Sequence, residues 1–467
     1  MHERTQEALA TNLKVISSRR LHIHVYGGGF LDFIVLINGM VWSPVLIFAF
    51  MLCALYFSVK TGFFQFAKAP IWLKSTLFSL FKKDKNKDEK ELSAFQAVCT
   101  ALGASIGTGN IVGVATAITM GGAGAVFWMI FSSFFSMMLI YAENYLGGLF
   151  KYRDKNGRLI NGAYAYMEKA LHSRNLGVLY AVLMVLTSFG MGNMAQSNSM
   201  AEALNTGFGI APAVTGTAAA LFVGIAIFGG VKRIARISTA LVPFMGILYI
   251  AGGTAVIIAN LSNLPQTVKY IFSDALSFKS AASGAAGYGI MRSMRYGISR
   301  GVFTNEAGIG TSVPLLGAGS DSPKKQGMWG IFQVFADTTV ICTITALAIL
   351  TSGACNIYPG LTGAALSARA FESVFGRSGN LFIAVSITLF ALATLLSWSV
   401  LGIKGTEYIF KKDVSFTYIV IFLIFIIVGS LNKSETVFEL SDIINGLMAV
   451  INIIVLFLLR RKVETKQ

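Results

Sequence analysis

Long apolar runs separated by short charged clusters are the feature that most restricts the fold of this chain. A helix that crosses a bilayer needs about 20 mostly apolar residues. Such runs occur near residues 39–62, 95–119, 123–150, 175–204, 211–229, 234–260, 283–313, 327–352, 379–403, 414–430 and 441–459. Lipid cannot hydrogen-bond to exposed backbone, so only helices and closed barrels can span it. The pattern therefore predicts an all-α polytopic membrane protein with 11 transmembrane helices.

Basic residues gather in alternate loops between these runs. Of the 38 Lys and Arg residues, 29 fall in one alternating set of segments and 9 in the other. The richer set comprises 60–93, 151–174, "VKRIAR", 292–325, 404–412 and the C-terminal "RRKVETKQ". Cytoplasmic loops carry the excess of positive charge, so we expect a multi-pass plasma-membrane protein with its N-terminus outside and its C-terminus in the cytoplasm. This topology accounts for the net charge of +16 without a nucleic-acid-binding face.

Glycines interrupt two of the spans. The second contains "GASIGTGNIVG" (103–113), and the seventh has glycines at 284, 287, 289, 297 and 301. With the first helix set aside, each glycine-rich span opens a group of five, a pattern that points to a transporter binding site. An unwound turn inside a bilayer needs protein or a polar cavity around it, and there its carbonyls can bind a cation and its amides a carboxylate. The same glycines form small-xxx-small pairs that let helices pack closely, and the glycine pattern alone does not separate the two interpretations.

The spans divide the chain into seven segments. We expect an N-terminal extension over 1–35, an extra transmembrane helix over 36–62, a cytoplasmic linker over 63–93, a first five-helix repeat over 94–262, an extracellular linker over 263–282, a second five-helix repeat over 283–460 and a cytoplasmic tail over 461–467. The charged run within the cytoplasmic linker is typical of a solvated connector.

The sequence contains no constellation of catalytic or metal-binding residues. Its four cysteines are far apart and form no CxxC pair, and its four histidines lie outside the apolar runs. The "GTGNIVG" segment lacks the preceding strand that a dinucleotide-binding loop requires. We therefore expect neither an enzyme nor a resident cofactor, and no obligate protein partner is evident.

Several blocks of sequence resemble the alanine or glycine:cation symporter family. They are "GASIGTGNIVGVATAITMGGAGAVFWM" (103–129), "GMGNMAQSNS" (190–199), "SRGVFTNEAGIGTSVP" (299–314), "KKQGMWGIFQVFADTTVICTITAL" (324–347) and "ATLLSWS" (393–399). The resemblance implies a leucine-transporter-type fold, in which two inverted five-helix repeats follow one extra N-terminal helix. It also implies a symporter that moves alanine, glycine or a similar small neutral amino acid into the cell with sodium by alternating access.

The resemblance places the substrate carboxylate at the first break. The unwound turn would be Thr108, Gly109 and Asn110, whose amides receive the carboxylate. Gln196, in the polar "NMAQSN" segment, would contribute a side-chain amide to the same pocket. Hydrogen bonding to a neighbouring helix is the alternative role for this glutamine.

The resemblance places the rest of the pocket in the second repeat. Gly297, Ile298 and Gly301 would form a second break that accepts the ammonium group through its carbonyls. Thr394 and Trp398 are four residues apart, so they share a helix face and would close the pocket. The bulk of Trp398 would favour alanine or glycine over larger substrates, and core packing is its alternative role.

The resemblance also implies a sodium site between the first broken helix and the ninth helix. Its ligands would be the carbonyls of Gly103, Ile106 and Phe390 and the hydroxyl of Thr394. The family commonly has two consecutive hydroxyl residues here, whereas this chain has Ala393 before the threonine. A proton-coupled amino acid transporter and a non-transporting amino acid sensor therefore stay open as alternatives.

Three acidic residues lie inside predicted spans, where ionisable groups are functional candidates by default. We expect Glu143 and Glu306 to serve in structural or gating ion pairs, and Asp337 to be the coupling residue if protons replace sodium. Their possible partners are the arginines of the seventh span, namely Arg292, Arg295 and Arg300.

Overall fold

The computed structural model describes residues 30–79, 92–276, 285–319, 321–432 and 434–465. These residues are mainly helical, with one antiparallel hairpin of β1 (Tyr152–Arg153) and β2 (Leu159–Ile160). Six helical stretches are long and apolar enough to cross a membrane: Gly124–Phe150 (α8), Arg174–Phe208 (α10 to α11), Gly230–Ala259 (α13), Pro323–Thr351 (α17 to α18), Arg377–Phe410 (α21) and Val437–Leu458 within α23 (Ser434–Leu458). The expected all-α polytopic class is confirmed. The number of spans, their orientation and the segment boundaries stay predictions.

Five shorter apolar helices complete the apolar part of the described chain. They are α3 (Pro44–Lys60), α6 (Ala94–Ser105), α7 (Val112–Gly121), α12 (Pro212–Ile227) and α22 (Ser415–Leu431). The central helix is α21, which contacts α6, α10, α11, α13 and α20. On one side of it α12 packs against α22, and elsewhere α8 packs against α15 and α17. The helices that carry the two glycine-rich spans are therefore held inside the bundle.

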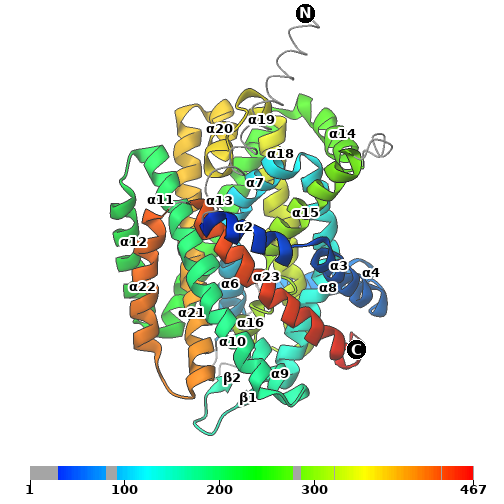
Figure 1. Cartoon of the computed structure of the whole chain (residues 1–467), viewed down its shortest axis with the longest axis vertical. Coiled ribbons are helices and arrows are strands. Elements are labelled where there is room, and N and C mark those ends of the chain that lie inside the picture. Colours follow the sequence, from blue (N-terminus) through cyan, green and yellow to red (C-terminus); the bar gives the residue numbers. More distant parts are fainter. Residues whose placement is uncertain (1–29, 80–91, 277–284, 320, 433, 466–467) are drawn as a thin grey trace, which may run out of the picture.

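The two ends of the molecule are built from short elements (Figure 1). One end gathers α14 (Leu264–Ala275), α19 (Ala354–Ile357) and α20 (Gly363–Phe375), and the other carries the hairpin and α9 (Ala163–Ala170). The apolar pattern places no span over α14, α19 or α20, because these helices are too short or too polar to give a transmembrane signal. Under the predicted orientation, the first end is extracellular and the second cytoplasmic.

The first glycine-rich span is broken in its middle. α6 begins at Ala94 because Ser93 forms a capping box with Gln96, each side chain accepting a hydrogen bond from the other's backbone N–H. α6 ends at Ser105, a 3₁₀ turn (η2) covers Thr108–Asn110, and α7 resumes at Val112. The unwound turn therefore lies where the sequence places it.

The second break lies elsewhere than predicted. α15 (Ala285–Asn305) runs without interruption through Gly297, Ile298 and Gly301, so the prediction of a break at these three residues is wrong. The chain unwinds instead over 306–311, before the short helix α16 (Ser312–Leu316). Here Glu306, Gly308 and Gly310 all have positive φ, at 59°, 83° and 90°.

Close packing is the physical reason for the glycines inside α15. A Cβ on Gly297 would lie 2.9 Å from the Cβ of Trp128 and 3.1 Å from the backbone nitrogen of Met129, both in α8. A Cβ on Gly301 would lie 3.3 Å from the Cγ of Met129. In this helix the small-xxx-small interpretation is the right one, because the two glycines let α15 approach the backbone of α8.

Two long helices carry wide π-helical turns. One is η3 (Gly190–Met194), between α10 (Arg174–Phe189) and α11 (Ala195–Phe208). The other is η6 (Phe335–Cys342), between α17 (Pro323–Val334) and α18 (Thr343–Thr351). Such turns occur frequently at functional sites. Each turn places a side chain that contacts the first break. Gln196 comes shortly after η3 in the chain, and Asp337 lies within η6.

Two expectations about charged segments need correction. Arg292, Arg295 and Arg300 lie within α15 and not in a loop, so they do not belong to the cytoplasmic charge count. The linker expected over 63–93 begins with α4 (Phe64–Ala67) and α5 (Ala69–Ser75), whose Trp72 is buried against Phe335. That part of the linker is packed onto the bundle, and residues 80–91 lie outside the described residues.

Gly297→Ala should destabilise the protein, whereas Gly289→Ala should not. Overpacking costs about 1–3 kcal/mol, and the backbone of α8 cannot yield as a side chain can. Gly289 belongs to the same helix and has nothing within 4 Å among the described residues, so alanine there should gain about 0.5–1 kcal/mol from lower chain entropy. Thermal unfolding in detergent measures both variants. Equal melting temperatures would contradict the close packing of α15 on α8.

Candidate functional site

Side chains satisfy the backbone amides at the first break. The N–H of Thr108 donates to Oε1 of Gln196 at 3.1 Å, and the N–H of Gly107 donates to Oδ1 of Asn110 at 2.9 Å. The amide nitrogen of Gln196 donates in turn to the carbonyl of Met191 in η3, at 3.0 Å. All these groups are buried. The structure thus brings Gln196 to the unwound turn, as predicted, and the π-helical turn orients it.

Two other helices approach the break on either side. A Cβ on Gly107 would lie 2.6 Å from Oγ1 of Thr394 in α21. A Cβ on Gly109 would lie 2.9 Å from Cγ2 of Thr304 and 3.4 Å from the ring of Phe303, both in α15. These two glycines are required because α21 and α15 contact the broken segment where a side chain would otherwise stand. Of the predicted residues, Thr394 therefore lies against the start of the break at Gly107, and Gly109 lies against α15.

Asp337 belongs to a buried network that starts at the break. Nδ2 of Asn110 donates to Oδ1 of Asp337 at 2.7 Å, and the hydroxyl of Thr338 donates to Oδ2 at 2.8 Å. The same amide lies 3.3 Å from Sγ of Cys342, and that thiol lies 3.9 Å from Oγ1 of Thr304. Asn110 also donates to the carbonyl of Asp337 at 3.2 Å, so Asp337 is bound directly to the unwound turn. Sequence reasoning missed Thr304, Thr338 and Cys342 as members of this group.

The predicted cation ligands lie along one contact between α6 and α21. Thr394 donates to the carbonyl of Phe390 at 3.1 Å, and its hydroxyl faces Gly107. Gly103 lies against the carbonyl of Ala393, 3.4 Å from where its Cβ would be. Carbonyl and hydroxyl oxygens suit a hard alkali ion. The described residues hold no group of three His, Cys, Asp or Glu that could bind a transition metal.

Glu306 and Trp398 meet at the second break. The indole nitrogen of Trp398 donates to Oε1 of Glu306 at 3.0 Å, and the hydroxyl of Thr311 donates to Oε2 at 2.6 Å. Trp398 also covers Gly192 of η3, where there is no room for a Cβ. Trp398 therefore ties α21 to the unwound segment 306–311, a contact that the sequence did not suggest.

Glu143 holds the same segment from α8. Nδ2 of Asn452 in α23 donates to Oε1 of Glu143 at 2.5 Å and to the carbonyl of Gly308 at 3.1 Å. The hydroxyl of Tyr180 donates to the carbonyl of Ile309 at 2.6 Å. Carbonyls freed by the second break thus find partners on α23 and α10. Asn452 was missed, although a polar residue inside an apolar run is the signal that identified Glu143.

The arginines of α15 do not pair with the three acids. Arg300 pairs with Asp442 of α23 at 2.9 Å, and their side chains are 12% and 9% exposed. The expectation that Arg300 pairs with Glu143, Glu306 or Asp337 is therefore wrong. The reason is geometric, because all three acids are already bound by neutral donors in the interior. Asp442, at the start of the last apolar run, was missed by the sequence reasoning.

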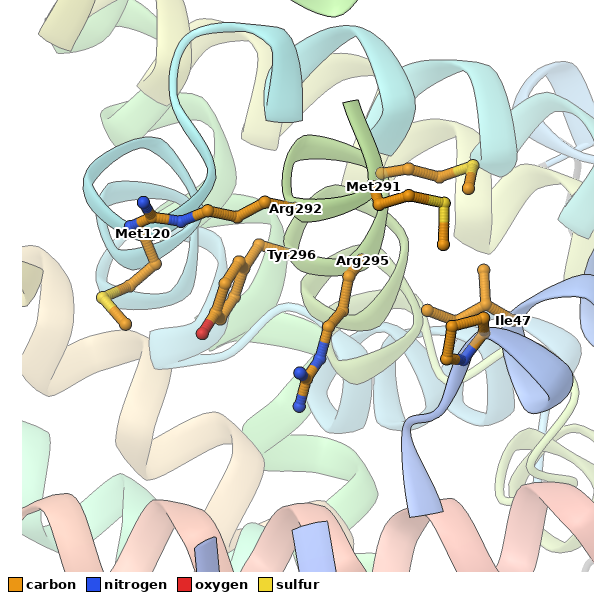
Figure 2. Close-up of a pocket in the computed structure, with 8 residues that line it drawn as sticks. Ile47, Met120, Met291, Arg292, Arg295 and Tyr296 are labelled. Atoms are coloured by element: carbon orange, nitrogen blue, oxygen red, sulfur yellow. The ribbon is translucent and has the colours of Figure 1, made fainter. Parts of the chain in front are cut away.

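Two cavities lie along α15, and one of them reaches this pair. A cavity of about 210 Å³ lies between the start of α3 and α15 and is lined by Pro44, Ile47, Met120, Met291, Arg292, Met294, Arg295 and Tyr296 (Figure 2). A second cavity, of about 500 Å³, shares Arg295 and Tyr296 with the first and reaches Arg300 and Asp442. Figure 2 shows the two arginine side chains extending from α15 in different directions. The pair Arg300–Asp442 therefore borders the second cavity, whose lining also contains Arg295 and Glu439.

Polar contacts hold the opposite end of the bundle together. Nζ of Lys404 in α21 donates to Oδ1 of Asn161 at 2.9 Å and to the carbonyl of Pro314 in α16 at 3.1 Å. Glu168 of α9 accepts hydrogen bonds from Tyr408 and Tyr152. Burial raises the pKa of Glu168, but these two hydrogen bonds and nearby positive charges outweigh it and lower the pKa. Glu168 thus stays a charged anchor between α9 and α21.

Comparison with known proteins shows similarity along nearly the whole chain. The sequence model described as the sodium:alanine symporter family matches residues 29–466. The sodium/alanine symporter AgcS of Methanococcus maripaludis is 36% identical over 449 residues, which cover 93% of this chain and 97% of that protein. The probable sodium/glutamine symporter GlnT of Bacillus subtilis is 36% identical over 431 residues, which cover 92% of this chain and 88% of that protein.

A solved structure shares the architecture. MhsT in complex with L-phenylalanine matches with a TM-score of 0.59 and 14% sequence identity, and the match covers 79% of this chain and 89% of that chain. At this identity the likeness speaks for the fold alone. It confirms the leucine-transporter-type fold.

Trp398→Phe should lower the free energy of unfolding by about 1–3 kcal/mol, because the buried carboxyl of Glu306 loses a donor. In a Glu306→Ala background the same change should cost less, since the acceptor is already gone. Trp128→Phe is the matched control, because that indole nitrogen has no hydrogen-bond partner among the described residues. Chemical unfolding in detergent gives all four values. An equal loss for the two tryptophans would contradict the assigned contact.

Proposed function

The chain belongs to the sodium:alanine symporter family, and we propose that it carries alanine, glycine or a similarly small neutral amino acid into the cell together with sodium. Its relatives are named as symporters, which places it among membrane transport proteins and not enzymes. The observation that carries the proposal is the break between α6 and α7, inside the bundle. Gln196 and Thr394 lie against its backbone, and Asn110 joins it to Asp337.

The break offers a place for the substrate carboxylate. The 3₁₀ turn Thr108–Asn110 leads into the N-terminus of α7, where amides and the positive end of the helix dipole favour an anion. The N–H of Thr108 is bound by a neutral amide oxygen of Gln196, and a carboxylate is the stronger acceptor for it. We expect the carboxylate to take over this donor, and the amide of Gln196 to turn toward the substrate.

The walls around the break favour a small side chain. Phe303 and Thr304 of α15 lie against Gly109, and Trp398 closes the contact between α21 and η3. Glutamine, which the name of the relative GlnT suggests as that protein's substrate, has four more heavy atoms than alanine. We propose that alanine and glycine fit here and that glutamine does not.

Sodium is the coupling ion that the α6–α21 contact suits best. The carbonyl oxygen of Ala393 faces Gly103, and the hydroxyl of Thr394, which donates to the carbonyl of Phe390, faces Gly107. A cation bound there would join the broken helix to α21, so its binding would change the stability of one conformation relative to another. A ligand shifts such an equilibrium only through its differential affinity for the two states.

Alternating access requires contacts that open and close at the two ends of the bundle. We propose that Arg300 and Asp442 form the outer gate, because this pair borders the cavity of about 500 Å³ and joins α15 to α23. We propose that the contact of Lys404 with Pro314 closes the cytoplasmic side, because it joins α21 to the half-helix α16. Rocking one group of helices against the other would break one contact while the other holds.

Labelled alanine should accumulate in proteoliposomes when sodium is higher outside than inside, and not when potassium replaces sodium. Thr394→Ala should remove most of the sodium dependence, because the hydroxyl is a direct ligand in this proposal. Excess unlabelled glycine should compete with alanine, and excess glutamine should not.

Two other results would contradict sodium symport, and each would support one of the alternative functions. If a proton gradient drives accumulation equally well without sodium, the coupling ion is a proton, and Asp337→Asn should then abolish uptake. If alanine binds but accumulates under neither gradient, the protein is an amino acid sensor and not a symporter.

Asp442→Asn should slow alanine uptake several-fold, because it leaves the charge of Arg300 without its partner in a largely buried place. The double variant Arg300→Gln/Asp442→Asn should recover part of the rate, since no unpaired charge remains. Initial rates of sodium-driven uptake compare the three proteins. If the single and double variants are equally slow, the pair does not act as a gate through its charge interaction.

A further inference from the structure

We infer that Ser397 supplies an oxygen ligand to the coupling cation and takes the place of the hydroxyl that is missing at position 393. This inference rests on the proposed sodium coupling and adds a residue to it. Neither the apolar pattern nor the resemblance singled out Ser397. Three observations about its position carry the argument.

The first observation is where the hydroxyl of Ser397 lies. A Cβ on Gly103 would be 2.8 Å from Oγ of Ser397 and 3.4 Å from the carbonyl oxygen of Ala393. Both oxygens therefore face the last turn of α6, immediately before the break. Gly103 is one of the residues whose carbonyl is expected to bind the cation. The third neighbour of Gly103 at this point is the apolar Val242 of α13.

The second observation is that this hydroxyl is buried and has no hydrogen-bond partner among the described residues. Serine and threonine inside a helix commonly donate to a carbonyl three or four residues earlier. Thr388, Thr394, Ser399 and Thr406 of α21 all do so. Ser397 does not, although an unpaired buried hydroxyl is unfavourable. A cation that accepts its lone pairs would satisfy it.

The third observation is the spacing along α21. Ser397 is four residues after Ala393 and three after Thr394, so the three residues lie on neighbouring parts of one helix face. A hydroxyl at 397 lies one turn closer to the cytoplasmic end than the hydroxyl expected at 393. The cation would thus be held between Thr394 and Ser397, with the carbonyl of Ala393 between them. Oxygen-only ligands are kept, so the site still suits a hard alkali ion.

A packing role is the competing explanation for Ser397. In that case the residue is small only so that α6 can approach α21 at Gly103, and alanine would serve equally well. The two explanations differ in one measurable quantity, which is the affinity of the protein for sodium.

The test measures equilibrium binding of ²²Na⁺ to the purified full-length protein in detergent without amino acid. Ser397→Ala should raise the dissociation constant for sodium about tenfold, which is the loss of a single good ligand. Ser386→Ala is the matched control, because Ser386 is buried in the same helix and its hydroxyl also lacks a partner among the described residues. It lies eleven residues away, about 16 Å along the helix axis, and its variant should stay within about twofold of the parent protein.

A second part of the test looks for a gain of affinity for sodium. Ala393→Ser should lower the dissociation constant for sodium in the parent protein, and it should restore binding in the Ser397→Ala background. This part does not depend on the stability of the Ser397→Ala variant alone.

The outcomes separate the inference from the proposed function. Saturable sodium binding by the parent protein, together with equal affinities of Ser397→Ala and Ser386→Ala, would overturn the role of Ser397 and leave sodium symport standing. Absence of saturable sodium binding by the parent protein would overturn both. Failure of Ala393→Ser to raise affinity in either background would also count against a shared site for positions 393 and 397.

Discussion

Every backbone group that a broken membrane helix frees must find a partner inside the protein, and this constraint organises the rest of the structure. At the first break, Gln196 accepts from Thr108 and Asn110 accepts from Gly107. At the second, Asn452 and Tyr180 donate to freed carbonyls. Gln196, Asn452 and Tyr180 belong to other helices, so each break is attached to neighbouring helices through side chains. In the proposed function, a bound amino acid or cation would compete for the groups at the first break.

The two breaks are served by different chemistry. Neutral amides and hydroxyls surround the first, with Asp337 one hydrogen bond away, which suits a site that must bind and release a zwitterion and a cation. Buried carboxyls hold the second, where Glu306 bonds to Trp398 and Glu143 shares Asn452 with Gly308. Side chains of α10, α21 and α23 all bind the second break directly. It is therefore better suited to transmit movement of α21 than to receive the substrate.

The first break was predictable and the second was not, for a physical reason. Close glycines around Thr108–Asn110 mark a turn because α21 and α15 leave no room for a Cβ there. In α15 the same residue type serves helix packing, so counting glycines misplaces the break by several residues. Glu306 adopts a positive φ, which glutamate rarely shows, and no sequence pattern predicts this backbone conformation. The partner of Arg300 was missed because pairing between two helices depends on how each helix is rotated about its own axis. The hydrophobic periodicity does not give the rotation of one helix relative to another.

Reciprocal binding of alanine and sodium tests the central claim most directly. If one broken helix joins both sites, sodium must raise the affinity for alanine by the same factor by which alanine raises the affinity for sodium. Equilibrium binding of labelled alanine across a sodium series, and of ²²Na⁺ across an alanine series, measures the two factors. The account predicts equal factors of about ten or more. An alanine affinity that does not change with sodium would contradict coupling at the α6–α7 break.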